Sequence, residues 1–141
     1  MEKEFVPYQE ALELKQLGFD EPCFGKWLSS LQSNWKDYEL ILEMGMNEEF
    51  EDNRNVYLLQ GACSAPLYSQ AFRWFREVHN LNSWVTKEHK YKQPFCWYIQ
   101  DNYSKYDSDF MTDGIHYNTY FKTYEEAELE CLQKLIELVK K

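Results

Sequence analysis

Residues 65–79 read APLYSQAFRWFREVH, and this stretch decides the fold because it carries the clearest periodic signal in the chain. At about 100° per residue, its apolar side chains share one broad arc, made up of Leu67, Tyr68, Ala71, Phe72, Trp74, Phe75 and Val78. Pro66 suits the first turn of a helix and Asn80 suits its end. The pattern predicts a helix over 67–79 with its aromatic face in the core.

Two further helices are predicted toward the ends of the chain. The first covers residues 6–17 and stops at Gly18, and the second opens at Thr123, which forms a capping box with Glu126. Near the start of each predicted helix, a tyrosine is followed three residues later by an alanine, at Tyr8/Ala11, Tyr68/Ala71 and Tyr124/Ala127. This recurrence is either one packing solution used three times or chance.

Strand patterns fill the rest of the chain. They cover residues 23–28, 37–43, 56–60, 83–86, 95–100 and 115–121, and the first two also allow a helical interpretation. The segment 115–121 is expected to pair antiparallel with 95–100, which shows the cleanest alternation. We therefore predict an α+β fold in which three helices pack on an antiparallel sheet of about four or five strands. A single domain is expected to span residues 1–141.

The composition limits the classes of partner. A net charge of −9 over 141 residues disfavours duplex nucleic acid and anionic membrane surfaces. The chain has no apolar run of about 18 residues and no secretory signal, so we predict a cytoplasmic protein without a membrane partner. Aromatic residues make up 18% of the chain, which indicates either an aromatic-rich core or rings placed in a pocket or in the contact of a homo-oligomer.

One basic cluster stands out in this acidic chain. Residues 73–92 hold two arginines and three lysines against two glutamates, a local balance of +3. Arginine forks hold phosphates, and aromatic rings stack on bases. We predict that an anionic, nucleotide-like ligand binds here, to Arg73, Arg76, Lys90, Lys92, Trp84, Tyr91 and His79. The alternative is a solvated helix face followed by a basic loop.

Other chemistries have weaker support, and we predict no catalytic residue, no metal site and no cofactor. Cys23, Cys63, Cys96 and Cys131 show no C-x-x-C spacing, which indicates free thiols rather than a zinc site. Cys23 lies on a predicted turn and is the best placed of the four for a thiol enzyme, although no signature surrounds it. The three histidines lack ligand spacing, and residues 107–114 fit a hairpin connection better than a calcium loop.

Three segments resemble a family of small uncharacterised proteins of gut bacteria and their phages: YQEALELKQLGFDEPCFG (8–25), APLYSQAFRWFR (65–76) and YEEAELECLQKLIE (124–137). The resemblance assigns neither an activity nor a catalytic residue to this chain. It does imply a phage or prophage product that binds a host factor or a defence-signalling nucleotide. The predicted function is therefore a non-enzymatic binding protein that sequesters such a nucleotide in an anti-defence role. The alternatives are a protein–protein adaptor or inhibitor of a host protein, and an enzyme that uses Cys23.

Overall fold

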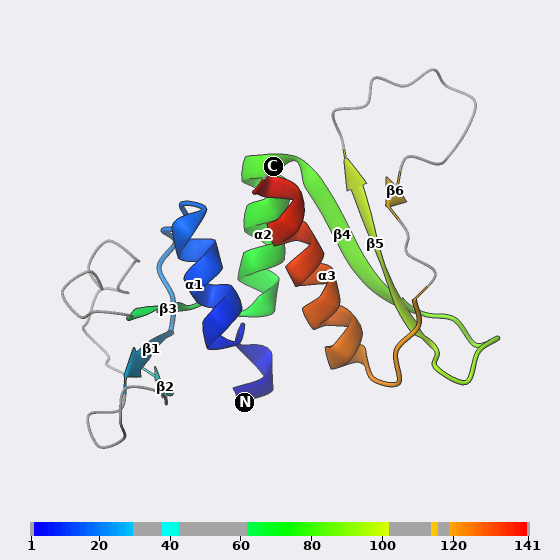
Figure 1. The fold of residues 1–141 in the computed structure, drawn as a ribbon, viewed down its shortest axis with the longest axis horizontal. Helices are drawn as coiled ribbons and strands as arrows, with labels where there is room; N and C mark the ends of the chain where they lie inside the picture. Colours follow the sequence, from blue (N-terminus) through cyan, green and yellow to red (C-terminus); the bar gives the residue numbers. More distant parts are fainter. Residues whose placement is uncertain (1, 30–37, 43–61, 102–113, 116–118, 141) are drawn as a thin grey trace. The chain divides into compact units, whose positions relative to one another are not determined.

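The computed structural model describes residues 2–29, 38–42, 62–101, 114–115 and 119–140 (Figure 1). Their contacts group the chain into two compact units, Met1–Gln70 and Ala71–Lys141. The described residues form three α-helices and two antiparallel sheets of three strands each, which confirms the α+β class. The expectation of one sheet of four or five strands is not confirmed, because the described strands pair in two separate sets. The single-domain assignment stays a prediction.

The first unit packs a helix on a small sheet. After the 3-10 turn η1 (Glu2–Glu4), helix α1 (Tyr8–Gln16) lies against strand β3 (Cys63–Ala65) (Figure 1). Strand β1 (Gly25–Ser29) is central in this sheet, between β3 and β2 (Tyr38–Leu42). The buried core of the unit includes Val6, Ala11, Leu14, Phe19, Trp27 and Cys63.

The end of α1 and the strands β1 and β2 follow the predictions made from the sequence. Gly18 takes a φ of +97° and ends α1, and the amide of Phe19 reaches back to the carbonyl of Leu14 at 3.0 Å. This is the left-handed helix end that glycine favours. Strands β1 and β2 confirm the strand interpretation of 23–28 and 37–43. The predicted strand at 56–60 lies outside the described residues.

The second unit packs a helix on a hairpin. Helix α2 (Tyr68–His79) begins in the first unit and leads into β4 (Leu81–Lys87) through Asn80, whose φ of +57° marks the end of the helix. Strand β4 pairs antiparallel with β5 (Phe95–Asp101), and β5 pairs with the two-residue strand β6 (Gly114–Ile115). Helix α3 (Tyr124–Val139) lies along β4 and β5 (Figure 1). The expected pairing of 115–121 with β5 is observed at Ile115 and, through an isolated bridge, at Phe121.

Burial along α2 follows most of the predicted arc. Trp74 and Phe75 are 4% and 0% exposed, whereas Val78 is 57% exposed, so its assignment to the buried face of α2 is wrong. Val78 lies in the last turn of α2, just before the chain enters β4, and the buried apolar face of the helix ends before this turn. On α3 the capping box between Thr123 and Glu126 is present as predicted. The buried face of α3 consists of Ala127, Cys131, Leu132, Leu135 and Ile136.

The recurring tyrosine and alanine occupy equivalent places at the three helix starts. Each tyrosine is the first residue of its helix, and the three alanines are 0–1% exposed, at Ala11, Ala71 and Ala127. The tyrosine environments differ. Tyr8 stacks on Tyr38 with a centroid separation of 3.4 Å, Tyr68 is 8% exposed, and Tyr124 is 45% exposed. The three helix starts therefore share a small buried alanine, which lets each helix approach its neighbours closely. The tyrosine rings have no common role.

Candidate functional site

The hairpin of β4 and β5 has two different faces. Val85 pairs with Trp97, and the ring of Phe95 meets Tyr124 of α3 edge-on, so these strand residues lie on the face that α3 covers. Side chains alternate along a strand, which places Trp84 and its partner Tyr98 on the other face. We call this second side the outer face of the hairpin.

A single carboxylate connects several side chains at this face. Tyr98 donates its hydroxyl to Oε1 of Glu88 at 2.8 Å, and Tyr120 donates to Oε2 at 3.2 Å. The thiol of Cys96 lies 3.7 Å from Oε1. The amide of Glu88 also donates to the carbonyl of Pro94 at 2.6 Å, which closes the loop between the strands. We refer to Glu88, Cys96, Tyr98 and Tyr120 as the Glu88 cluster.

Two of the predicted ligand-binding rings rest on this cluster. Trp84 stacks on Tyr98 with centroids 5.5 Å apart and planes 12° from parallel. Tyr91 packs against Tyr120 with ring centroids 4.2 Å apart and planes tilted by 34°. Trp84 and Tyr91 remain 46% and 49% exposed, so each presents a free surface to solvent. The structure thus connects Trp84 and Tyr91 through two tyrosines that donate to the same carboxylate.

The tyrosine hydroxyls of the Glu88 cluster are held in the protonated form. The hydrogen bond to Glu88 raises the pKa of Tyr98 above its ordinary value of 10.0, with burial as the second cause. The pKa of Tyr120 is raised mainly by a hydrogen bond with Tyr91, and also by burial and by Glu88. Because the neutral phenols are the donors, both hydrogen bonds to Glu88 persist across the neutral pH range.

The predicted charged residues are all exposed. Lys90 and Lys92 lie in the loop between β4 and β5, next to Tyr91 in the chain. Arg73 and Arg76 lie on α2, where Arg76 forms an ion pair with Glu77 at 4.0 Å. The two lysines are thus neighbours of Tyr91 in the chain, and the two arginines lie on the helix that precedes β4.

His79 differs from the other predicted site residues. Its ring lies edge-on to Trp74 at 4.6 Å and also contacts Phe75. Its Nε2 is buried and has no hydrogen-bond partner among the described residues. Burial lowers the pKa of His79 below its ordinary value of 6.5, so the imidazole is neutral at pH 7 and adds no positive charge for an anion.

All four cysteines are free and buried. Burial raises the pKa of Cys23 from 9.0 to about 12, with the carboxylate of Glu21 as the next cause. Burial also raises the pKa of Cys63 and of Cys131 to about 12. A nucleophilic thiol needs a lowered pKa and access to solvent, and Cys23, which is 2% exposed, has neither. These observations argue against the alternative of a Cys23-dependent enzyme.

We expect the native protein to resist thiol reagents at neutral pH. A rise from 9.0 to about 12 lowers the thiolate fraction of Cys23 about a thousandfold, and burial blocks access as well. A colorimetric disulfide reagent at pH 7.5 should therefore label none of the four cysteines within minutes, and all four after addition of guanidinium chloride. Fast labelling of one native thiol, located by peptide mass spectrometry, would return that cysteine to consideration as a nucleophile.

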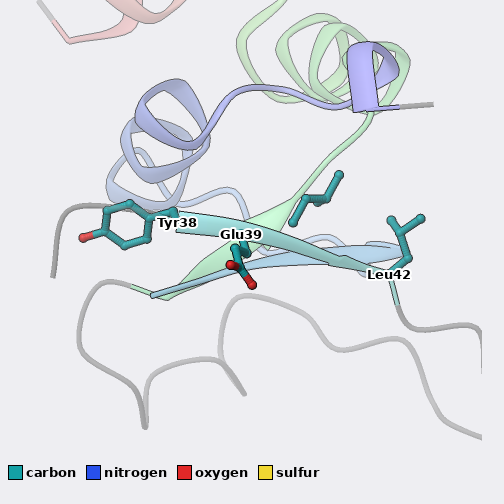
Figure 2. A pocket seen from close by; sticks show the side chains of 4 residues that line it. Tyr38, Glu39 and Leu42 are labelled. Carbon is teal, nitrogen blue, oxygen red and sulfur yellow. The ribbon is translucent and has the colours of Figure 1, made fainter. Parts of the chain in front are cut away.

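A hollow lies along β2 in the first unit (Figure 2). Its volume is about 430 Å³, and its described lining consists of Tyr38, Glu39, Leu40 and Leu42. One carboxylate among apolar side chains does not suit an anion, and none of the predicted ligand-binding residues lines this hollow. The hairpin of the second unit therefore remains the candidate site.

Two searches within the described residues give negative results. No group of three His, Cys, Asp or Glu side chains there is arranged to hold a metal ion. None of the helices formed by these residues is both long and apolar enough to cross a membrane. No family model, curated protein or solved structure matches this chain.

Proposed function

We propose that this protein is a non-enzymatic binding protein for a small anionic ligand that carries an aromatic ring, with nucleotides as the leading class. One observation carries the proposal. Trp84 and Tyr91 are half exposed, and each is backed by a tyrosine that donates to Glu88. Rings held in place before a ligand arrives lose little conformational entropy on binding, so they form an efficient stacking surface.

We assign the negative groups of the ligand to four exposed cations of the second unit. Lys90 and Lys92 flank Tyr91 in the chain and are exposed, so we assign their ammonium groups to the phosphate of a nucleotide whose base stacks on Tyr91. Arg73 and Arg76 are exposed on α2, and we assign their guanidinium groups to the phosphates of the ligand as well. Arginine suits it because its planar fork matches two phosphate oxygens.

The resemblance to proteins of gut bacteria and their phages supports signalling nucleotides as the first ligands to test. A phage or prophage product that sequesters such a nucleotide would act in an anti-defence role without a catalytic group. The buried thiols agree with a binding function, because they leave the chain without an accessible cysteine nucleophile among the described residues.

Titration calorimetry tests the proposal with a panel of cyclic dinucleotides, cyclic mononucleotides and ADP-ribose. For any nucleotide that binds, Lys90→Ala combined with Lys92→Ala should weaken binding about a hundredfold, because each lost charged contact contributes about 1.5 kcal/mol or more. Lys122→Ala is the matched control, since it removes an exposed lysine from the segment before α3. Absence of heat with every nucleotide, or equal weakening by the control, would exclude the proposed ligand class.

An adaptor or inhibitor of a host protein is the alternative proposal. The observation in its favour is a pair of exposed apolar side chains in the first unit, Phe24 at 49% and Ile41 at 40%. Affinity capture from host lysate separates the two proposals, because a stoichiometric protein partner, lost in a Phe24→Ala, Ile41→Ala variant, supports the adaptor.

A further inference from the structure

The two exposed rings of the candidate site stand at separate places on the hairpin. Trp84 lies on β4 and pairs with Tyr98 of β5. The ring of Tyr91 packs instead against Tyr120. The residue after Tyr120 bridges to Phe95 on the side of β5 away from β4. Strand β5 therefore runs between the backbone of Trp84 and the segment that supports Tyr91.

The geometry of the sheet gives the distance between these two places. Neighbouring strands lie about 4.8 Å apart, so the segment of Tyr120 is about 10 Å from β4 across the sheet. Phe95 and Tyr98 are three residues apart on β5, which adds about 7–10 Å along the strand at about 3.4 Å per residue. The two places are therefore about 12–14 Å apart at the backbone. A single base that stacks on one ring cannot reach the other.

One carboxylate holds the two places in a fixed relation. Tyr98 and Tyr120, which support the exposed rings, both donate to Glu88, at 2.8 Å and 3.2 Å. Trp84 and Tyr91 are each about half exposed, so each has surface for a base. The hairpin thus presents two stacking surfaces at a set spacing before a ligand binds. A ligand that carries two bases at this spacing gains from both without a large loss of conformational entropy in the protein.

We propose that the ligand of this site is a short single-stranded nucleic acid, with one base on Trp84 and a later base on Tyr91. At about 3.4 Å per stacked nucleotide, three or four phosphodiester steps cover the span. Lys90 and Lys92, which flank Tyr91 in the chain, are assigned to phosphates of this strand. The inference rests on the proposed function, because it gives the same rings and lysines to a ligand with several bases.

A duplex does not suit this site. Its bases are already stacked on one another, so their faces are closed to Trp84 and Tyr91. The net charge of −9 over the whole chain also opposes the dense phosphates of a duplex. A single strand exposes its bases, and stacking on aromatic side chains supplies much of the affinity in such complexes.

A length series of oligonucleotides tests the inference by titration calorimetry. The probes are thymidine monophosphate and oligothymidylates from the dinucleotide to the octanucleotide, with the matching oligouridylates to tell DNA from RNA. We expect the affinity to rise at least about tenfold up to the tetranucleotide or pentanucleotide and then to level off, because one further stacked base is then engaged. A duplex oligonucleotide should bind at least about tenfold more weakly than the single strand.

Ring variants show whether both surfaces are used. Trp84→Ala and Tyr91→Ala should each weaken binding of the pentanucleotide about tenfold. The monophosphate should bind each variant with little change in affinity, because the other ring remains. Tyr124→Ala is the matched control, since Tyr124 is similarly exposed but touches Phe95 on the face that α3 covers. Circular dichroism verifies that each variant is folded.

Salt dependence reports on the phosphates. Each phosphate contact of a single strand contributes about 0.7 to the slope of log affinity against log salt concentration. Lys90→Ala combined with Lys92→Ala should therefore reduce this slope by about 1.4 for the pentanucleotide. Lys122→Ala should leave the slope unchanged.

The outcomes separate this inference from the proposed function. Equal affinity for the monophosphate and the pentanucleotide, loss of pentanucleotide binding in only one ring variant, or a duplex that binds as tightly as the single strand overturns the inference alone. The site then still binds nucleotides one at a time. Absence of binding by every mononucleotide, cyclic dinucleotide and oligonucleotide overturns both.

Discussion

Phe75→Ala should lower the free energy of unfolding by about 3–5 kcal/mol, the cost typical of emptying a buried phenylalanine site. Phe75 is 0% exposed and lies on α2 beside Trp74, whose ring centroid is 5.0 Å from its own. The variant loses both the transfer free energy of the ring and the contacts around the cavity that it leaves. Urea unfolding, followed by far-ultraviolet circular dichroism, measures the change.

Val78→Ala provides the control on the same helix. Val78 is 57% exposed, so its truncation should change the free energy of unfolding by no more than about 0.5 kcal/mol. Sequence periodicity alone assigns Phe75 and Val78 to the same buried arc. Similar costs for the two variants would contradict the placement of α2 in the structure.

Glu88→Ala is expected to have the second large effect, a loss of about 2–3 kcal/mol in the free energy of unfolding. The substitution removes the acceptor shared by Tyr98 and Tyr120 and leaves both half-buried hydroxyls without it. The same urea titration measures the loss. Glu130→Ala, which truncates an exposed glutamate on α3, serves as the control and should be nearly neutral.

Phenolate absorbance gives a second readout of the Glu88 cluster. The pKa of Tyr98 is raised by its bond to Glu88, so it should fall toward 10.0 in Glu88→Ala. The stability that this bond contributes is fully present below pH 10 and declines as pH rises above it, because the unfolded chain loses the phenolic proton first. An unchanged alkaline titration in the variant would show that Glu88 does not hold Tyr98.

The extent to which the structure follows from the sequence depends on the range of the interactions. Helix α2 has a long stretch of periodic apolar residues, and α3 begins with a capping box, so residues close together in the chain specify both helices. Strand β3 was not predicted because its three residues, all buried, are too few to show alternation. Val78 was misplaced because periodicity does not reveal where the apolar partner of a helix ends.

The candidate site was predictable only in part. Trp84, Tyr91, Lys90 and Lys92 follow from composition within one short stretch. Glu88 was counted there merely as an opposing charge, because its partners Cys96, Tyr98 and Tyr120 lie 8, 10 and 32 residues away. A local pattern carries no signal for bonds that form only when the hairpin and the segment before α3 come together.

The capping box of α3 has a consequence for the order of folding. Its bonds join Thr123 and Glu126 over three residues, so they can form before any distant part of the chain arrives. Helix initiation is the slow step for an isolated segment, and a satisfied first turn lowers that barrier. We therefore expect the first turn of α3 to form early in folding, before α3 packs against β4 and β5.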